Sequence, residues 1–233
     1  MDERMAGPPG GEAAMADQAG ADDARARARH AAEAALAAIP ERERTPAVAA
    51  AVARLEATLG EALRLADLDP LAPIANRRAF VRELARFIAF SGRQAMEASL
   101  LYLDVNGFKQ VNDDFGHNAG DAALTHVARI LLDNVRGSDV VGRLGGDEFG
   151  VILAAADPAA AAEKAARLAE AIRAAPFVWQ GRATPLGVAI GVAPVRPGRD
   201  AAAVIAEADK AMYADKRRQR AENPGTSGDD VGQ

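Results

Sequence analysis

The sequence has no cysteine, which excludes disulfides, zinc–thiolate sites and cysteine nucleophiles. It has no apolar run approaching the roughly 20 residues that a membrane-spanning helix needs, so we expect no membrane span. The opening Met-Asp-Glu-Arg has no apolar stretch behind it and does not resemble a secretory signal, so we expect a cytoplasmic protein. Neither sign of charge is in large excess, because 28 basic and 33 acidic residues give a formal net charge of -5. That balance argues against a general nucleic-acid-binding protein, although a nucleotide site needs only a few local cations.

Aromatic residues make up only 4% of the chain, and none lies before Phe80 or after Tyr213. Because large aromatic side chains dominate core burial, the packed domain is predicted to span residues 67–220. The Gly-, Ala- and Pro-rich stretch 1–20 and the polar tail 221–233 are predicted to be disordered. The part between them, 21–66, is predicted to be a helical N-terminal segment.

Two helices are predicted in this N-terminal segment. Residues 22–38 are rich in alanine and end before Pro40, and Thr45 is a predicted N-cap with Pro46 in the first turn. Apolar residues then recur at alternating steps of four and three, at Val48, Val52, Leu55, Leu59, Ala62 and Ala66. This heptad-like stripe is typical of a short dimerising stalk, but also of a helix that packs on its own domain or on the preceding helix.

Helices and strands alternate beyond residue 66. The apolar patterns predict helices over 77–91, 119–134, 158–174 and 200–219, and strands over 99–103, 140–144, 149–153 and 188–195. The alternation predicts an α/β fold, an α+β sandwich in which helices cover a sheet. Gly145 and Gly146 lie between two strands and predict a tight hairpin, since a type I′ turn needs positive φ at both central positions.

Acidic residues follow two of the predicted strands. Asp147 and Glu148 come directly after the glycine pair, and since successive strand residues point to opposite faces, we expect them to have different roles. Asp104 follows strand 99–103, at the kind of strand end where α/β proteins bind ligands. If Asp104 and a hairpin acid converge, they form an oxygen site suited to Mg²⁺ and nucleotide phosphates. Gly107 permits close backbone approach, and a helix beginning there would direct free amides towards phosphate. Taken alone, Gly-Gly-Asp-Glu is more typical of a surface hairpin with solvated acids.

Four motifs in order resemble the GGDEF family of diguanylate cyclases over about residues 67–220. Gly145–Phe149 is the family's name-giving motif, intact. The others are Asn76-Arg77-Arg78, the stretch from Asp104 to His117 with Gly120-Asp121, and a C-terminal signature at Ala208-Asp209, Met212-Tyr213, Lys216 and Arg220. The resemblance implies a nucleotidyl-cyclase-like domain with a central, mainly antiparallel five-stranded sheet flanked by helices, preceded here by the N-terminal helices.

The resemblance also implies an activity and the residues that perform it. The implied reaction condenses two GTP into cyclic di-GMP and releases two pyrophosphates, with Mg²⁺ (or Mn²⁺) as cofactor. The implied metal ligands are Asp104, the Val105 carbonyl, Asp147 and Glu148. The implied catalytic residues are Asp147, Glu148 and Lys109. The implied GTP-binding residues are Phe108, Lys109, Asn112, Asp121, Gly145, Gly146, Lys216 and Arg220.

Asp121 gives the implied site a preference among bases. A carboxylate only accepts hydrogen bonds, and guanine offers its N1–H and 2-amino group as adjacent donors, whereas adenine has an acceptor at N1. Asp121 therefore predicts GTP over ATP, with Asn112 as the second guanine reader. Without the register of the other motifs, Asp121 is more typical of a helix cap, and Asn112 of a helix surface or core edge.

The resemblance implies regulation as well. Each domain holds one GTP and the product joins two, so a homodimer is expected. Arg136-Gly-Ser-Asp139 has the spacing of the family's product-inhibition motif, Arg-x-x-Asp, and an arginine can grip phosphate and guanine edges in a bidentate manner. The alternative is a surface Arg–Asp pair at a strand entry. Ala171 stands where the accessory arginine of such sites is often found.

Several positions depart from the family pattern. Ala72-Pro73 replaces a Thr-Gly pair, Ala189 replaces a Ser, Asp215 and Gln219 replace an Ala and a Gly, and Asn106 stands where a second Asp is frequent. None removes an implied metal ligand, base reader or phosphate-binding cation. The main rival function is a catalytically weak or inactive GGDEF module that binds GTP or cyclic di-GMP as a signalling effector. An adenine-containing dinucleotide cyclase is disfavoured by Asp121, and a purely structural dimerisation protein leaves the acids unexplained.

Overall fold

A computed structural model of the chain describes residues 26–43, 45–94 and 97–222. The segment 1–20, predicted to be disordered, lies outside these residues, as does the predicted tail apart from its first two residues, which belong to a helix. The chain divides into two compact units between Leu68 and Asp69. Among the described residues, no helix combines the length and the hydrophobicity needed to cross a bilayer.

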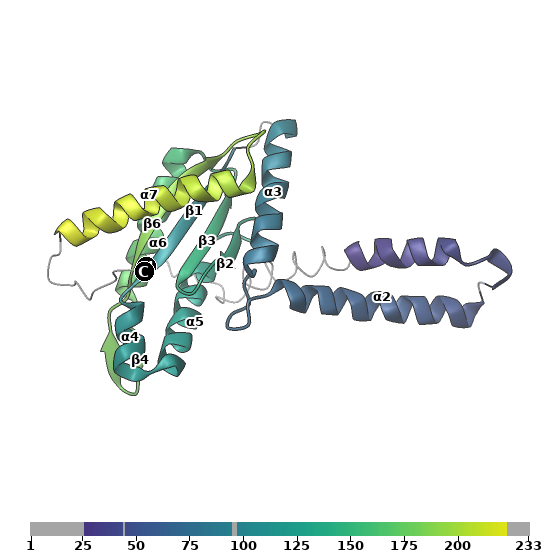
Figure 1. Cartoon of the computed structure of the whole chain (residues 1–233), viewed down its shortest axis with the longest axis horizontal. Coiled ribbons are helices and arrows are strands. Elements are labelled where there is room, and N and C mark those ends of the chain that lie inside the picture. Colours follow the sequence, from purple (N-terminus) through teal and green to yellow (C-terminus); the bar gives the residue numbers. More distant parts are fainter. Residues whose placement is uncertain (1–25, 44, 95–96, 223–233) are drawn as a thin grey trace, which may run out of the picture. The chain divides into compact units, whose positions relative to one another are not determined.

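The first unit is a pair of helices. Residues 26–38 are helical, a short 3₁₀ turn η1 (Glu41–Glu43) follows, and α2 (Pro46–Asp67) runs back alongside (Figure 1). Arg27 is paired with Asp67 at 2.5 Å and Arg29 with Glu56 at 3.6 Å. The predicted N-cap is confirmed: the Thr45 hydroxyl oxygen accepts a hydrogen bond from the Val48 amide at 3.3 Å, with a proline in the first turn.

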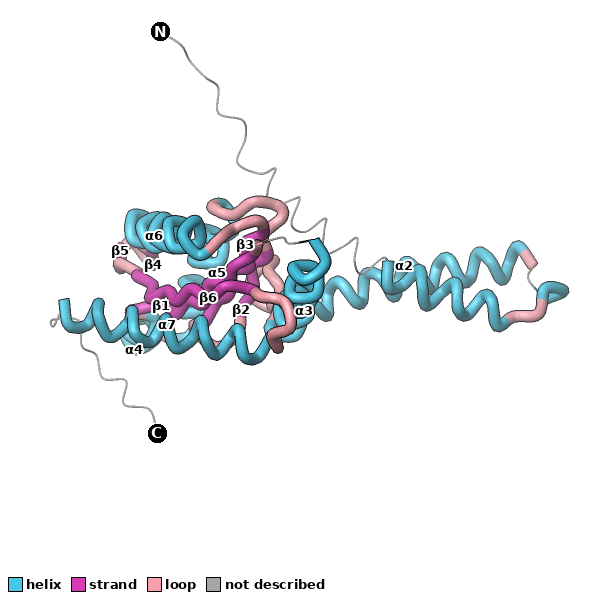
Figure 2. Tube along the Cα trace, turned by 90° about the horizontal axis from the view of Figure 1, so that it is seen from above, coloured by secondary structure: helices cyan, strands magenta, loops and turns pink. Residues whose placement is uncertain are grey.

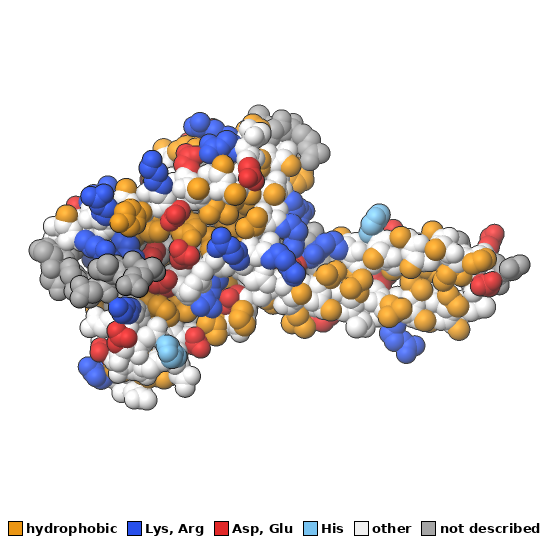
Figure 3. Space-filling view, in the orientation of Figure 1, with side chains coloured by type: hydrophobic (Ala, Val, Ile, Leu, Met, Phe, Trp, Pro, Cys, Tyr) orange, Lys and Arg blue, Asp and Glu red, His pale blue; other side chains and the backbone are white. Residues whose placement is uncertain are grey.

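The predicted apolar stripe of α2 divides between two environments. Val48 and Val52 are partly buried, and the buried Gly60 lies on the same side of the helix. Leu55 is 68% exposed and Leu59 is 40% exposed. The preceding helix therefore covers only the first part of the stripe. Figure 3 shows hydrophobic side chains on the surface of this unit.

The second unit is built on an antiparallel sheet. Its strands are β1 (Ala98–Asn106), β2 (Val140–Arg143), β3 (Glu148–Ala154) and β6 (Gly187–Val195), in the order β2-β3-β1-β6. All three neighbouring pairs are antiparallel. The α+β class and the antiparallel sheet are thus confirmed, with β1 as a central strand.

Among the described residues the main sheet has four strands, where five were expected. The missing strand is reduced to one residue, Ala75, which makes a parallel bridge to Gly142 through hydrogen bonds with Val141 and Arg143. Two features keep it short. Pro73 has no amide hydrogen to donate, and Asn76 already caps the next helix by accepting from the Ala79 amide at 3.0 Å.

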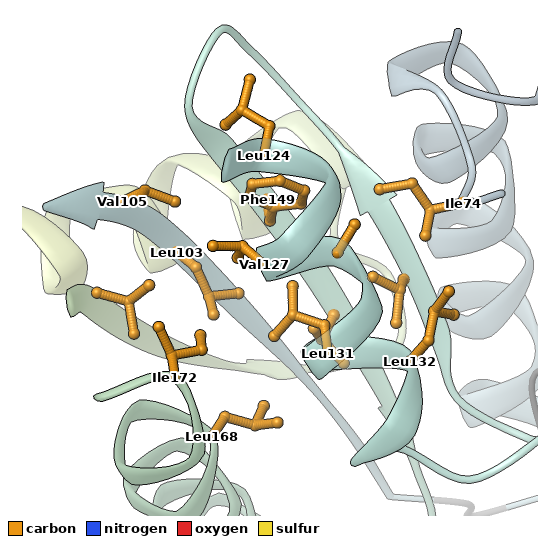
Figure 4. Packing of buried hydrophobic residues seen from close by; sticks show 14 of the residues in the cluster. Ile74, Leu103, Val105, Leu124, Val127, Leu131, Leu132, Phe149, Leu168 and Ile172 are labelled. Carbon is orange, nitrogen blue, oxygen red and sulfur yellow. The ribbon is translucent and has the colours of Figure 1, made fainter. Parts of the chain in front are cut away.

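Helices cover both faces of the sheet (Figure 2). The helices are α3 (Arg77–Gln94), α4 (Phe108–Phe115), α5 (His117–Asp133), α6 (Pro158–Ala174) and α7 (Ala201–Glu222). Alternate residues of β1 enter two cores, because strand side chains point to opposite faces. Leu101 and Leu103 join the core under α5 and α6, while Leu100 and Tyr102 join the core under α3 and α7. Figure 4 shows the first core, where Leu131 of α5 and Leu168 of α6 pack near Leu103.

Two turn predictions need correction. Neither Gly145 nor Gly146 has positive φ, so the loop between β2 and β3 is not a type I′ turn. It is a wider loop in which the Leu144 and Gly145 amides both donate to the Glu148 carbonyl. The positive-φ pair lies instead at Gln180 (φ 48°) and Gly181 (φ 80°), between β4 (Phe177–Trp179) and β5 (Arg182–Thr184). The sequence analysis missed this separate two-stranded hairpin.

Candidate active site

The pairing of β1 with β3 brings the two acidic stretches together. Asp104 lies directly opposite Glu148, and the Val105 amide donates to the Asp147 carbonyl at 3.1 Å. Directly paired residues of antiparallel strands project from the same face of a sheet. The Asp104 and Glu148 carboxylates therefore arise side by side, on the face covered by α3 and α7.

Asp104 is nearly buried and carries an ion pair. The Lys216 ammonium, from α7, donates to Asp104 Oδ1 at 2.7 Å. The Asp104 side chain is 12% exposed and that of Lys216 is 19% exposed. Water screens so protected a pair poorly, so each charge stabilises the other more than a surface pair would. The pair fixes one implied phosphate-binding cation beside one implied metal ligand.

Glu148 is held by the Tyr102 phenol and fits against Gly145. Burial raises the pKa of Tyr102 above its usual range, and the neighbouring Glu148 charge and hydrogen bond raise this pKa further. The phenol therefore stays protonated and donates to the carboxylate. A Cβ on Gly145 would overlap Glu148 Oε2, so only glycine leaves room for this arrangement.

Two arginines hold the glycine loop. Arg77 Nη1 donates to the Leu144 carbonyl at 2.6 Å, and Arg143 donates to the Gly146 carbonyl from Nε at 3.1 Å and from Nη2 at 2.8 Å. Arg143 Nη1 also lies 3.5 Å from Asp69 Oδ2. The sequence analysis quoted Arg77 within a motif but gave neither arginine a role. For Arg143 the available signal was its place two residues before the glycine pair, whereas Arg77 is distant in the sequence.

The implied guanine readers form a second group on α4 and α5. Gly107 has φ 83° and is the N-cap of α4, which confirms the prediction that a helix begins there. A Cβ on Gly120 would overlap Asn112 Oδ1 and lie 3.1 Å from the Phe108 ring. The side chains of Asn112 and Phe108 therefore lie against Gly120. The next residue in the chain, Asp121, is exposed. Lys109 is exposed in the first turn of α4.

The implied phosphate-binding cations of α7 lie one turn apart. Lys216 and Arg220 are four residues apart and so share a helix face. Arg220 is exposed in the last turn. A Cβ on Gly191 of β6 would overlap backbone atoms of Ala208 and Met212, so α7 packs directly on the sheet before it reaches Lys216.

The implied inhibitory residues lie at the other end of β2 from the glycine loop. The buried Asp139 accepts hydrogen bonds from the Arg136 amide at 2.9 Å and from the Ala154 amide at 3.0 Å. Both carboxylate oxygens thus hold the connection from α5 to β2. The Arg136 side chain is exposed. The surface Arg–Asp pair considered as an alternative does not describe this geometry, because Asp139 bonds backbone amides.

The donor set fits a hard divalent cation. Asp104, Asp147 and Glu148 offer carboxylates and Val105 offers a carbonyl. Asp104, Val105 and Glu148 lie on two adjoining strands, and Asp147 is the last residue of the loop before β3. Hard cations such as Mg²⁺ take oxygen ligands and often keep water or substrate phosphates in their shell. The described part of the chain contains no group of three or more His, Asp or Glu side chains already gathered as a metal site. Substrate oxygens would therefore have to complete the coordination.

A family model described as "Diguanylate cyclase, GGDEF domain" matches residues 66–222. The chain is 36% identical over 156 residues to the probable diguanylate cyclase DgcE of Escherichia coli K12. The aligned stretch covers 66% of this chain and 14% of DgcE. It is 36% identical over 152 residues to the diguanylate cyclase DgcP of Pseudomonas aeruginosa, covering 65% of this chain and 23% of DgcP. The matched stretch thus spans less than a quarter of either relative.

Solved structures give the same match. A sensory box/GGDEF family protein from Caulobacter crescentus CB15 superposes with a TM-score of 0.62 at 37% identity, covering 65% of this chain and 99% of that one. The coiled coil and GGDEF domain of DgcB from Caulobacter crescentus, in complex with c-di-GMP, gives a TM-score of 0.68 at 29% identity, covering 73% of this chain and 91% of that one.

Proposed function

The chain belongs to the GGDEF domain family, and from that premise we propose that it is a diguanylate cyclase acting on GTP. The 3′-oxygen of each ribose bonds to the α-phosphorus of the other nucleotide, while the bond from that phosphorus to the pyrophosphate oxygen breaks. Each 3′-hydroxyl gives up its proton, and two GTP become one cyclic di-GMP and two pyrophosphates. Because GTP is a cytoplasmic metabolite, we place the reaction in the cytoplasm.

The observation that carries the proposal is the pairing of Asp104 with Glu148 across β1 and β3, with Lys216 on Asp104. Carboxylates for a cation and a cation for phosphate then lie at one place on the sheet. Preorganised charges of this kind stabilise developing charge in a transition state more than mobile water does.

We assign the metal site to Asp104, the Val105 carbonyl, Asp147 and Glu148. A bound Mg²⁺ (or Mn²⁺) would neutralise phosphate charge and align the reacting groups. The protein's own contribution is positional. Tyr102 orients Glu148, the Val105–Asp147 backbone bond holds the glycine loop beside β1, and Arg77 and Arg143 fix that loop's carbonyls.

We assign GTP binding to both groups of residues. Asn112 and Asp121 read the guanine edge, with Phe108 beside Asn112. Lys109, Lys216 and Arg220 hold the phosphates, and Gly145 and Gly146 let the triphosphate approach the backbone. Nothing lies within 4 Å of where a Cβ on Gly146 would stand, so that side of the loop is open to a ligand.

The proposal extends to a homodimer. Each catalytic unit, residues 67–220, brings one GTP, and the helical segment 21–66 is the proposed stalk that pairs two copies. Support comes from Leu55 and Leu59, which α2 leaves exposed in a heptad-like register. Product inhibition is proposed at Arg136 and Asp139, where the buried Asp139 shapes the turn and the exposed Arg136 meets cyclic di-GMP.

The rival function, a module that binds GTP or cyclic di-GMP without turnover, has one observation in its favour. Lys216 engages Asp104 directly, and catalysis would require Asp104 to coordinate a metal as well. The test is purified protein with GTP and Mg²⁺ over a range of protein concentrations. Cyclic di-GMP and pyrophosphate in a 1:2 ratio, with specific activity rising with concentration, support the cyclase. Nucleotide binding without pyrophosphate release supports the rival.

A further inference from the structure

Three polar side chains form a hydrogen-bonded network beside the candidate active site. Gln219 Nε2 donates to Asp215 Oδ2 at 2.7 Å and to the Val188 carbonyl at 3.2 Å, and Asn106 Nδ2 donates to Gln219 Oε1 at 2.9 Å. Asp215 Oδ2 also accepts from the Ile190 amide at 3.1 Å. The network therefore joins α7 to both β6 and the end of β1.

The network meets the edge of the sheet. In the described sheet β6 is an outer strand, and every second residue of such a strand directs its backbone groups away from its neighbour. Val188 and Ile190 are two residues apart, and side chains of α7 bond a carbonyl of one and an amide of the other. Asp215 and Gln219 thus act as a short substitute for a neighbouring strand.

The residues of the network also flank the Lys216–Asp104 ion pair, along the helix on one side and across the strands on the other. Lys216 follows Asp215 directly, and Gln219 precedes Arg220. On the sheet, Asp104 is paired with Ala189, the residue between Val188 and Ile190. The same few residues thus fix both the helix turn that carries Lys216 and the strands beneath Asp104.

The direct packing of the α7 backbone on the sheet lies before this turn. Close packing against Gly191 holds the helix at Ala208 and Met212, one turn or more before Lys216. Beyond that point α7 runs to its C-terminus at Glu222, where helix ends fray. The long, flexible Lys216 side chain needs a fixed backbone to present its ammonium at one place.

We infer that Asp215 and Gln219, anchored by Asn106, are positioning residues that hold Lys216 for the triphosphate of the substrate. The inference rests on the proposed use of GTP. It assigns these residues a role in phosphate affinity, distinct from base recognition at Asn112 and Asp121, which lie on other helices.

The test compares two probes in Mg²⁺ by calorimetry. 3′-Deoxy-GTP carries the triphosphate but lacks the attacking hydroxyl, and GMP carries the same base with one phosphate. We expect Asp215→Ala and Gln219→Ala each to weaken 3′-deoxy-GTP binding by about five- to tenfold, the effect of losing one or two hydrogen bonds, with GMP binding changed less than about twofold. Asp215→Asn keeps an acceptor for the Ile190 amide and should recover part of the loss.

Two further variants separate positioning from general stability. Arg218→Ala removes only the exposed partner of Asp215 and should bind both probes as the parent does. In a Lys216→Ala background, Gln219→Ala should have little further effect on 3′-deoxy-GTP, because the residue acts through Lys216. Unchanged triphosphate affinity in both network variants, equal losses for both probes, or additive losses with Lys216→Ala would each overturn the inference.

The parent protein separates this inference from the proposed function. Parent protein that binds 3′-deoxy-GTP but makes no cyclic di-GMP from GTP overturns the cyclase and leaves the positioning role to be decided by the binding comparison. Parent protein that binds no triphosphate overturns both.

Discussion

Three glycines of the catalytic unit allow contacts that any side chain would block. A Cβ would overlap Glu148 at Gly145, Asn112 at Gly120, and the backbone of α7 at Gly191. Two of these contacts place proposed site residues, and the third seats the helix that carries Lys216. At these positions the missing Cβ matters more than backbone freedom, since none of the three has positive φ.

Gly191→Ala is expected to lower the free energy of unfolding by about 1–3 kcal/mol or more. The added Cβ would overlap backbone atoms of α7, which cannot move aside as a flexible side chain can. Gly146→Ala is the matched control, since nothing lies within 4 Å of its Cβ position and its φ is not positive. We expect a change within about 0.5 kcal/mol for the control. Urea denaturation measures both, and equal effects would contradict the close packing of α7.

Tyr102 predicts a pH dependence of stability. Its pKa lies above the usual 10.0 in the folded protein, so its stabilising contribution is complete below pH 10.0 and is lost as the pH rises towards the folded value. Above pH 10.0 the free energy of unfolding should fall more steeply with pH in the parent than in Tyr102→Phe. The difference between the two slopes should reach up to about 1.4 kcal/mol per pH unit. Denaturation of both proteins across this range tests the expectation, and parallel curves would contradict it.

At the scale of elements, the connections between helices and strands position the proposed site residues, and the strand register brings Asp104 opposite Glu148. The β2–β3 loop is held at its carbonyls by Arg77 and Arg143, and α4 and α5 meet where Asn112 crosses Gly120. The connection between α5 and β2 depends on Asp139, which bonds two backbone amides. The two residues of the Arg-x-x-Asp motif therefore differ in what they do for the fold.

Asp139→Ala should destabilise the protein by about 1–3 kcal/mol, because two amides lose their acceptor. Arg136→Ala should leave the unfolding free energy within about 0.5 kcal/mol, since its side chain is exposed. Binding of cyclic di-GMP, measured by calorimetry at a temperature where both variants are folded, should be lost in Arg136→Ala. Retained binding there would remove the proposed inhibitory site.

At the scale of the whole molecule, the proposed homodimer would draw on both units. One unit of residues 67–220 carries one set of the proposed guanine readers, and Leu55 and Leu59 of α2 are exposed. If two copies pair through this stripe, dimerisation would set the rate at low protein concentration.

Leu55→Glu combined with Leu59→Glu should move the monomer–dimer equilibrium towards monomer and lower specific activity at least about tenfold at low concentration, since charges on an apolar seam are strongly unfavourable. Ala57→Glu on the opposite face of α2 is the control and should change neither. Sedimentation velocity and product formation are measured on the same samples. Full activity from a monomeric double variant would contradict the stalk.

Local patterns predicted most of the elements. The Thr45 cap, helix 158–174 and the strand before Asp104 follow from side chains that act on their own neighbours in the chain, and the structure confirms them. The hairpin at Gln180-Gly181 was missed because its strands are only three residues long. The type I′ turn expected at Gly145-Gly146 was wrong because neither glycine has positive φ, and the loop instead places Gly145 against the Glu148 side chain.

The sequence by itself determined the family and which acids, bases and amides are available for chemistry, since these depend on residue type and local spacing. Only the tertiary structure decided their partners: Lys216 on Asp104, 112 positions away, Tyr102 on Glu148, and Gln219 between Asn106 and Val188. The physical reason is range. A cap or a periodic stripe acts within a few residues, whereas an ion pair between a strand and a distant helix exists only after the sheet and its covering helices have packed.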